Sequence, residues 1–209
     1  MRTESPGPRW AAPDVVLRRV HISRDERGLR PGLASIHRAL ATSHILGRGL
    51  KLAVISDTHM PRGTRRLPKE CLRLLTEADR IVHAGDFVSV ALYEELGKLA
   101  PVDGVVGNMD EPDLRLILPP KLVVEHEGVR IGIVHDAGPA AGRAARLVEG
   151  FPGCDAVVYG HTHVPEGTRL GETWILNPGS PTERRSAPHH GMIGLELEDG
   201  GLDVRTYVL

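Results

Sequence analysis

From Leu50 onward, short apolar runs alternate with amphipathic segments. Runs such as Leu52–Ser56 and Ala156–Tyr159 are typical of buried strands. The apolar positions of Pro68–Ala78 recur at helical spacing, and this pattern predicts a helix. Ser89 is a good N-cap for a second helix that runs to about Leu99.

The rest of this region shows the same two patterns. A third helix, opened by its proline, is expected over Pro139–Val148. Further strands are expected over Arg80–Ala84, Val102–Val106, Leu122–Glu125, Val129–Val134, Thr173–Leu176, Ile193–Glu198 and Leu202–Val208. An early strand–helix–strand rhythm followed by antiparallel strands indicates an α/β domain with two sheets stacked between helices.

Residues 1–49 differ in composition from the rest and are rich in Arg, Pro, Gly and Ser. Nine arginines and no lysine stand against four acidic residues in the first 50 positions, which gives +5 there and leaves −6 for the remainder. We therefore divide the chain into a basic N-terminal extension, 1–49, and one domain, 50–209. The extension is interpreted as a mobile tail or as sequence upstream of the true start; the alternative is a basic arm that touches phosphates.

Composition excludes several classes of protein. Two cysteines cannot form a disulfide framework, so we expect a reducing compartment, the cytoplasm. The chain lacks an apolar run approaching the roughly 20 residues that span a bilayer, so we expect no membrane partner. A net charge of −1 argues against a dedicated nucleic-acid binder.

Polar residues follow each buried strand of the domain. The carboxyl ends of strands form the ligand crevice in α/β sheets, so these side chains are expected to share one pocket. The candidates are Asp57, His59, Asp86, Asn108, His135, His161 and His163. Glycines at 85, 107 and 160 would let the backbone turn sharply there.

This set of donors indicates a metal centre. Carboxylate, amide and imidazole groups without thiolate suit Mn, Fe, Co, Ni or Zn better than Ca. Asp57/His59 and His161/His163 are i, i+2 pairs, which an extended chain directs to one side. Seven candidate ligands are too many for one ion and suit two divalent ions that share a carboxylate.

The ordered motifs carry a family resemblance. Asp57-x-His59, Gly85-Asp86, Gly107-Asn108-x-Asp110, His135 and Gly160-His161-x-His163 resemble the signature of the calcineurin-like metallophosphoesterases, most of all the small bacterial and archaeal phosphodiesterase branch. The resemblance implies a four-layer αββα sandwich of two mixed sheets. It also implies that Asp57, His59 and His163 hold one metal, that Asn108, His135 and His161 hold the second, and that Asp86 bridges both.

The resemblance and the donor set together predict a metal-dependent phosphoesterase. Two cations would neutralise phosphate oxygens and supply hydroxide near neutral pH, with Mn as the first expectation for the metal. Small, nucleotide-like phosphodiesters are the expected substrates, with some monoester activity, because no cap domain is expected over the site. A noncatalytic metal-binding scaffold of the same fold is the alternative.

Other positions near the motifs are candidate substrate contacts. We expect four residues to touch substrate. These are Asn108 and, from the segment after Thr173–Leu176, Asn177, Ser180 and Arg184. Met109 stands where many relatives have a His that can contact the leaving group, and a thioether cannot donate a proton. We therefore expect slower turnover of esters with poor leaving groups.

Overall fold

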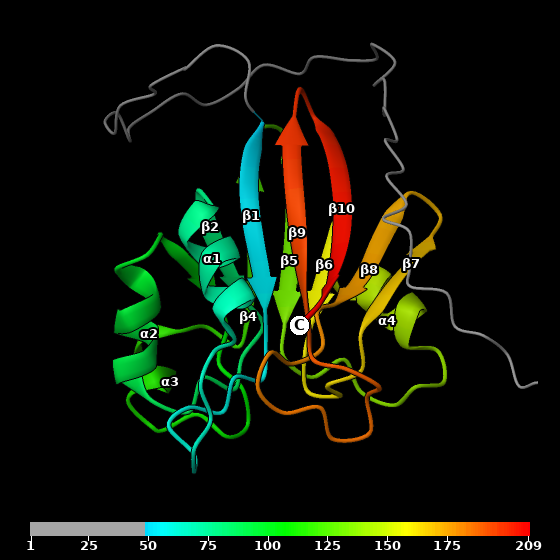
Figure 1. Cartoon of the computed structure of the whole chain (residues 1–209). Coiled ribbons are helices and arrows are strands. Elements are labelled where there is room, and N and C mark those ends of the chain that lie inside the picture. Colours follow the sequence, from blue (N-terminus) through cyan, green and yellow to red (C-terminus); the bar gives the residue numbers. More distant parts are fainter. Residues whose placement is uncertain (1–48) are drawn as a thin grey trace, which may run out of the picture.

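The computed structural model describes residues 49–209, so the expected extension over 1–49 lies, apart from Gly49, outside the described residues. Two five-stranded sheets make up most of this part of the chain (Figure 1). The first sheet has the order β10-β9-β1-β2-β3, and the second has the order β4-β5-β6-β8-β7. Their strands are β1 (Leu50–Ile55), β2 (Arg80–His83), β3 (Val102–Gly104), β4 (Lys121–His126), β5 (Val129–Val134), β6 (Ala156–Tyr159), β7 (Glu166–Leu170), β8 (Thr173–Asn177), β9 (Gly191–Glu198) and β10 (Gly201–Val208).

Three apolar clusters separate four layers, which confirms the expected αββα sandwich. Inward-facing residues of both sheets, such as Val54 and Ile133, form the central cluster. A second cluster lies between the first sheet and the helices α1 (Lys69–Glu77) and α2 (Val90–Gly97). A third lies between the second sheet and α4 (Arg143–Gly150).

The β1 strand shows why an unbroken apolar run is needed in the middle of such a sandwich. Leu52 and Val54 face the central cluster, whereas Ala53 and Ile55 face the helix side of the sheet. Successive side chains of a strand point to opposite faces, so a strand covered on both faces is apolar throughout.

The helices differ from the sequence-based expectation at two places. The α4 helix begins at Arg143, with Gly142 at its N-cap, and not at Pro139. Gly142 has a φ of 69°, a left-handed conformation that interrupts a helix started by the proline. A short helix, α3 (Leu114–Ile117), was not predicted because four residues carry too little periodicity. Within residues 49–209, none of the helices combines the length and the apolar character that crossing a bilayer requires.

The strand β7 was also missed. Its residues Glu166–Leu170 include a glycine and two charged side chains, because β7 is an edge strand with much of its length exposed. An edge strand needs no continuous apolar run, and its sequence therefore resembles a loop.

Parallel pairing places the candidate site. The strands β1, β2 and β3 run parallel to one another, as do β5, β6 and β8 in the second sheet. The loops that follow these strands gather at the lower end of the molecule in Figure 1. The site is therefore built from the carboxyl ends of strands of both sheets.

A polar cluster fastens the β3 edge of the first sheet to β4 of the second. Arg80 donates two hydrogen bonds of 2.8 Å to the Asp103 carboxylate, and His126 Nε2 lies 3.2 Å from Asp103 Oδ2. Burial alone would raise the pKa of Asp103, but the hydrogen bonds from Arg80 and His126 outweigh burial and lower this pKa to about 2. The carboxylate is therefore ionised and contributes to stability at neutral pH.

We predict that Asp103→Asn lowers the free energy of unfolding at pH 7 by about 1–3 kcal/mol, since Arg80 loses a charged partner. A carboxyl whose pKa is lowered by folding stabilises the protein above its unfolded pKa of about 3.9, and this contribution is lost as the pH falls through the folded value. The difference between wild type and variant, measured by urea unfolding, should thus shrink from about pH 4 toward pH 2. A difference that does not change with pH would contradict this account.

Candidate metal centre

The first cluster at the strand ends consists of Asp57, His59 and His163. Their ligand atoms lie within 4.8 Å of one another, and all three residues are buried. His163 Nε2 lies 3.3 Å from both Asp57 Oδ1 and His59 Nε2. These residues come from the loop after β1 in the first sheet and the loop after β6 in the second, so the cluster joins the two sheets.

The second cluster consists of Asp57, Asp86 and His135, and Asn108 is adjacent to it. His135 Nε2 lies 3.4 Å from Asp86 Oδ2 and 3.0 Å from Asn108 Oδ1. His59 Nε2 lies 3.6 Å from Asp86 Oδ2, which places Asp86 between the first and second clusters.

His161 lies at the outer edge of the second cluster. Its Nδ1 is 3.0 Å from Asn108 Oδ1, and both residues are more exposed than the other candidates. The structure thus brings all seven predicted residues to one end of the sandwich, with Asn108 and His161 on the solvent side of the buried second cluster.

The geometry of the histidines fits a cation. His163 Nδ1 lies 2.5 Å from the Glu183 carbonyl oxygen, and His135 Nδ1 lies 2.8 Å from that of Ala84. A carbonyl oxygen only accepts, so Nδ1 carries a proton and Nε2 is the nitrogen that faces the site. Each Nε2 then faces carboxylate or amide oxygens, which are also acceptors, and a proton or a metal ion is needed between them.

Burial and charge act together on the site carboxylates. Burial alone would raise the pKa of Asp86, but His135 and the Met109 N–H outweigh it and lower this pKa to about 2. Likewise, burial alone would lower the pKa of His135, yet the Asp86 carboxylate holds it above its usual value. The site therefore holds ionised carboxylates in a buried place, as a cation-binding centre requires.

The backbone of the two i, i+2 pairs of candidate ligands has a different conformation from the one expected. Asp57 and His59 have φ values of 54° and 46°, and His161 and His163 have 67° and 60°. All four residues therefore have left-handed backbone, and the expectation of an extended chain was wrong. Left-handed backbone is uncommon for residues other than glycine, and surrounding structure must hold it in place.

Glycines let the loops approach closely, as the sequence indicated. A Cβ on Gly107 would lie 2.1 Å from Asp86 Oδ1, and one on Gly160 would lie 2.7 Å from the Ala84 carbonyl oxygen. Either side chain would push the loops apart.

Two side chains in the shell around the site orient the candidate ligands. Ser56 donates a hydrogen bond of 2.7 Å to Asp57 Oδ2, which leaves Asp57 Oδ1 to face His163. Asp110 accepts hydrogen bonds from the backbone N–H groups of Asp86, Val88 and Gly107. Asp110 thus ties the loop after β2 to the loop after β3.

Not all of the residues that we expected to contact substrate are accessible to it. The side chains of Asn177 and Ser180 are fully buried, and the structure uses them internally. Asn177 donates to the Gly160 carbonyl oxygen, and Ser180 donates to the Asp57 carbonyl oxygen. Both side chains support the loops of the site, which corrects the expectation of direct substrate contact. Arg184 is exposed and donates to the Pro188 carbonyl oxygen.

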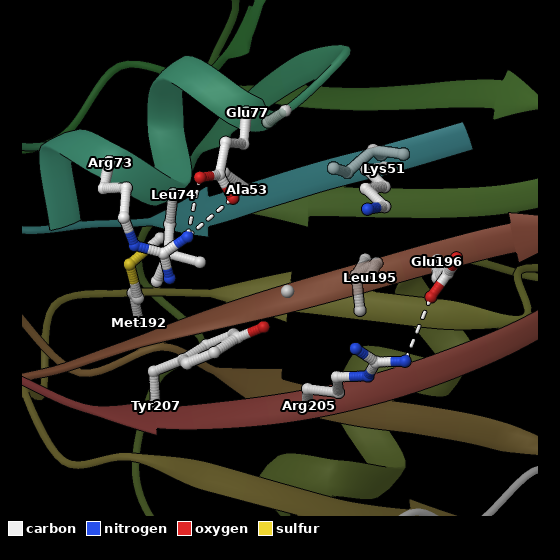
Figure 2. A pocket seen from close by; sticks show the side chains of 13 residues that line it. Lys51, Ala53, Arg73, Leu74, Glu77, Met192, Leu195, Glu196, Arg205 and Tyr207 are labelled. Carbon is white, nitrogen blue, oxygen red and sulfur yellow. Dashed lines mark hydrogen bonds and ion pairs between the residues drawn. The ribbon is translucent and has the colours of Figure 1, made fainter. Parts of the chain in front are cut away.

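A hollow of about 250 Å³ lies elsewhere, on the outer face of the first sheet between α1 and β10 (Figure 2). Arg73 and Glu77 line one side, and Tyr207 and Arg205 line the other. None of the seven candidate ligands lines this hollow.

Comparison with known proteins decides the family. Residues 50–200 match the profile of the calcineurin-like phosphoesterase superfamily domain. This chain belongs to that superfamily. Membership in the calcineurin-like phosphoesterases, with buried donor clusters of the right kind, supports a metal-dependent phosphoesterase.

Individual relatives agree with this placement. The chain is similar to a probable metallophosphoesterase of Methanocaldococcus jannaschii, with 36% identity over 177 residues, 83% of this chain and 90% of the relative. A phosphodiesterase of the same organism is 25% identical over 146 residues, 62% of this chain and 83% of the relative. Among solved structures, wild-type Vps29 of Entamoeba histolytica complexed with Zn²⁺ has 26% identity and a TM-score of 0.66, covering 77% of this chain and 93% of that one.

We predict that Asp110→Asn weakens metal binding about 10–100-fold, the usual effect of changing a group that orients ligands. The amide can no longer accept from all three backbone N–H groups, so the loops lose their alignment. Isothermal titration with Mn²⁺ measures the effect, and the exposed Asp113→Asn is the matched control. Equal affinities of the two variants would show that Asp110 does not position the site.

Proposed function

We propose that this protein is a two-metal phosphoesterase that hydrolyses small phosphodiesters. The observation that carries the proposal is the facing of acceptor atoms: His163 Nε2 against Asp57 Oδ1, and His135 Nε2 against Asp86 Oδ2 and Asn108 Oδ1. In this proposal Asp57, His59 and His163 hold one ion, Asn108, His135 and His161 hold the other, and Asp86 is shared.

The ions, when bound, would neutralise phosphate oxygens and lower the pKa of water. The chain itself supplies orientation. The Ala84 and Glu183 carbonyl oxygens fix the tautomers of His135 and His163, and Asp110 fixes the loop that carries Asp86. Rigid placement of this kind is what a displacement at phosphorus requires.

The substrate class follows from the exposure of the site. Asn108 is exposed and His161 is half-exposed, so substrate would enter from solvent at the second cluster. An open site suits small phosphodiesters and nucleotide-like molecules, and some monoester activity is expected. The phosphodiesterase among the relatives supports the same preference. The net charge of −6 after residue 50 makes nucleic acid an improbable substrate.

The metal and the cellular compartment are also part of this proposal. A set of oxygen and nitrogen donors without thiolate suits Mn²⁺, and Fe, Co, Ni or Zn would fit the same donors. The two cysteines, Cys71 and Cys154, are both free and buried, as a cytoplasmic protein would have them.

We predict that the purified protein hydrolyses bis-p-nitrophenyl phosphate in added Mn²⁺ and that Asp86→Ala abolishes this activity, since both ions lose a shared ligand. A matrix of metals against aryl diesters, cyclic nucleotides and monoesters measures the preference. Metal binding without hydrolysis of any substrate would favour the noncatalytic scaffold. Full activity of Asp86→Ala would overturn the assignment of the ligands.

We predict further that Met109→His speeds hydrolysis of alkyl esters more than that of aryl esters. Met109 is half-buried beside the site, and its backbone N–H donates to Asp86 Oδ1 at 2.7 Å. An imidazole there could protonate a poor leaving group, whereas an aryl oxide leaves without help. The ratio of kcat/KM for the two ester types is the measurement, and an unchanged ratio would refute the role of position 109.

A further inference from the structure

Glu183 lies at the metal centre although it belongs to none of the motifs. Its backbone is fixed at both ends of the residue. The Glu183 N–H donates to Ser180 Oγ at 2.9 Å, and its carbonyl oxygen accepts from His163 Nδ1. Since Ser180 also donates to the Asp57 carbonyl oxygen, the turn that carries Glu183 is fastened to both sides of the first cluster.

The Glu183 carboxylate lies between a cation and a candidate ligand. Its Oε1 is 2.8 Å from Arg65 Nη2, and its Oε2 is 3.7 Å from His59 Nε2. The side chains of Glu183 and Arg65 are each 28% exposed, so their ion pair lies at the solvent edge of the site.

The distance to His59 suits a shared ion. Two ligand atoms bonded to one ion at about 2.0–2.2 Å each lie at most about 4.4 Å apart. The separation of 3.7 Å between Glu183 Oε2 and His59 Nε2 falls within this limit, as do the 3.3 Å to His163 and the 3.6 Å to Asp86 measured from the same nitrogen. Glu183 lies outside the group in which the ligand atoms of Asp57, His59 and His163 are all within 4.8 Å of one another, so its carboxylate has to move inward to reach the same ion.

Charge explains why Arg65 is there. Glu183 would add a third carboxylate beside Asp57 and Asp86, and like charges in a partly buried place repel one another. The Arg65 guanidinium neutralises Glu183 at the edge of the site. A divalent ion beside His59 would neutralise it equally well and draw the carboxylate inward.

We propose that the Glu183 carboxylate is an additional ligand of the ion held by Asp57, His59 and His163, and that Arg65 is its partner only while that ion is absent. This inference rests on the proposed two-metal function. It assigns a third carboxylate to this ion, so the first position would bind its metal more tightly than the second, two of whose proposed ligands, Asn108 and His161, are partly exposed.

The test is metal binding by the full-length protein after removal of metal by chelation. Isothermal titration with Mn²⁺, and the visible absorption of bound Co²⁺, which depends on the number and kind of its ligands, are measured for four proteins. These are wild type, Glu183→Gln, Arg65→Met and the control Glu172→Gln, which removes the same charge from an exposed turn. Thermal unfolding of each metal-free protein verifies that it is folded.

We expect Glu183→Gln to weaken binding at one of two positions at least tenfold and to change the Co²⁺ spectrum, because even a group that only orients a ligand changes affinity by 10–100-fold. Glu172→Gln should behave as wild type. Arg65→Met should bind equally well or more tightly, since the carboxylate no longer has to leave an ion pair.

Other results separate the two proposals. If Glu183→Gln binds Mn²⁺ as wild type does, Glu183 is not a ligand and the two-metal function stands. If Arg65→Met and Glu183→Gln weaken binding equally, the ion pair itself supports the loops, and the ligand role is overturned. If wild type binds no metal, the proposed function fails and this inference fails with it.

Discussion

The end of the sandwich that carries the site is constrained by hydrogen-bond acceptor atoms that face one another at close range. Asp57, Asp86 and three histidines bring their acceptor atoms within 3.3–3.9 Å, in a place that water scarcely reaches. Such an arrangement is costly without a cation, because the usual remedy of solvation is missing. Three surrounding features hold these atoms together: the left-handed backbone of the ligand residues, the glycines, and the carbonyl oxygens that set the histidine tautomers.

The hydrophobic core and the polar residues at the end of the sandwich contribute to the site in different ways. The central apolar cluster holds the two sheets together, and the parallel strands within each sheet, β1 beside β2 and β5 beside β6, deliver their carboxyl ends to the site. Asp110 and Ser180 complete the placement by accepting or donating hydrogen bonds across loops, a task that apolar packing cannot perform.

The sequence was most informative where physics allows few alternatives. Val54 and Val158 had to lie in buried strands, and polar residues directly after such strands had to meet at one edge, so the four layers and the gathering of seven donors could be predicted. The strand β7 could not, because an exposed edge strand does not need apolar residues. Glu183 could not, since it lies in a turn without periodicity and only the folded chain brings it to His59. The buried positions of Asn177 and Ser180 also depend on tertiary contacts that no local pattern records.

The candidate ligands are divided between the two sheets, and this division has a mechanical consequence. Asp57, Asp86 and Asn108 follow strands of the first sheet, whereas His135, His161 and His163 follow strands of the second. Neither cluster can be completed from a single sheet, because His163 joins Asp57 and His59 in the first, and His135 joins Asp57 and Asp86 in the second. A shear of one sheet against the other would alter the distances from His135, His161 and His163 to the ligands of the first sheet, while each sheet remained intact. The distances among the candidate ligands therefore depend on how the two sheets are aligned. A substitution deep between the sheets can alter metal binding without touching a ligand.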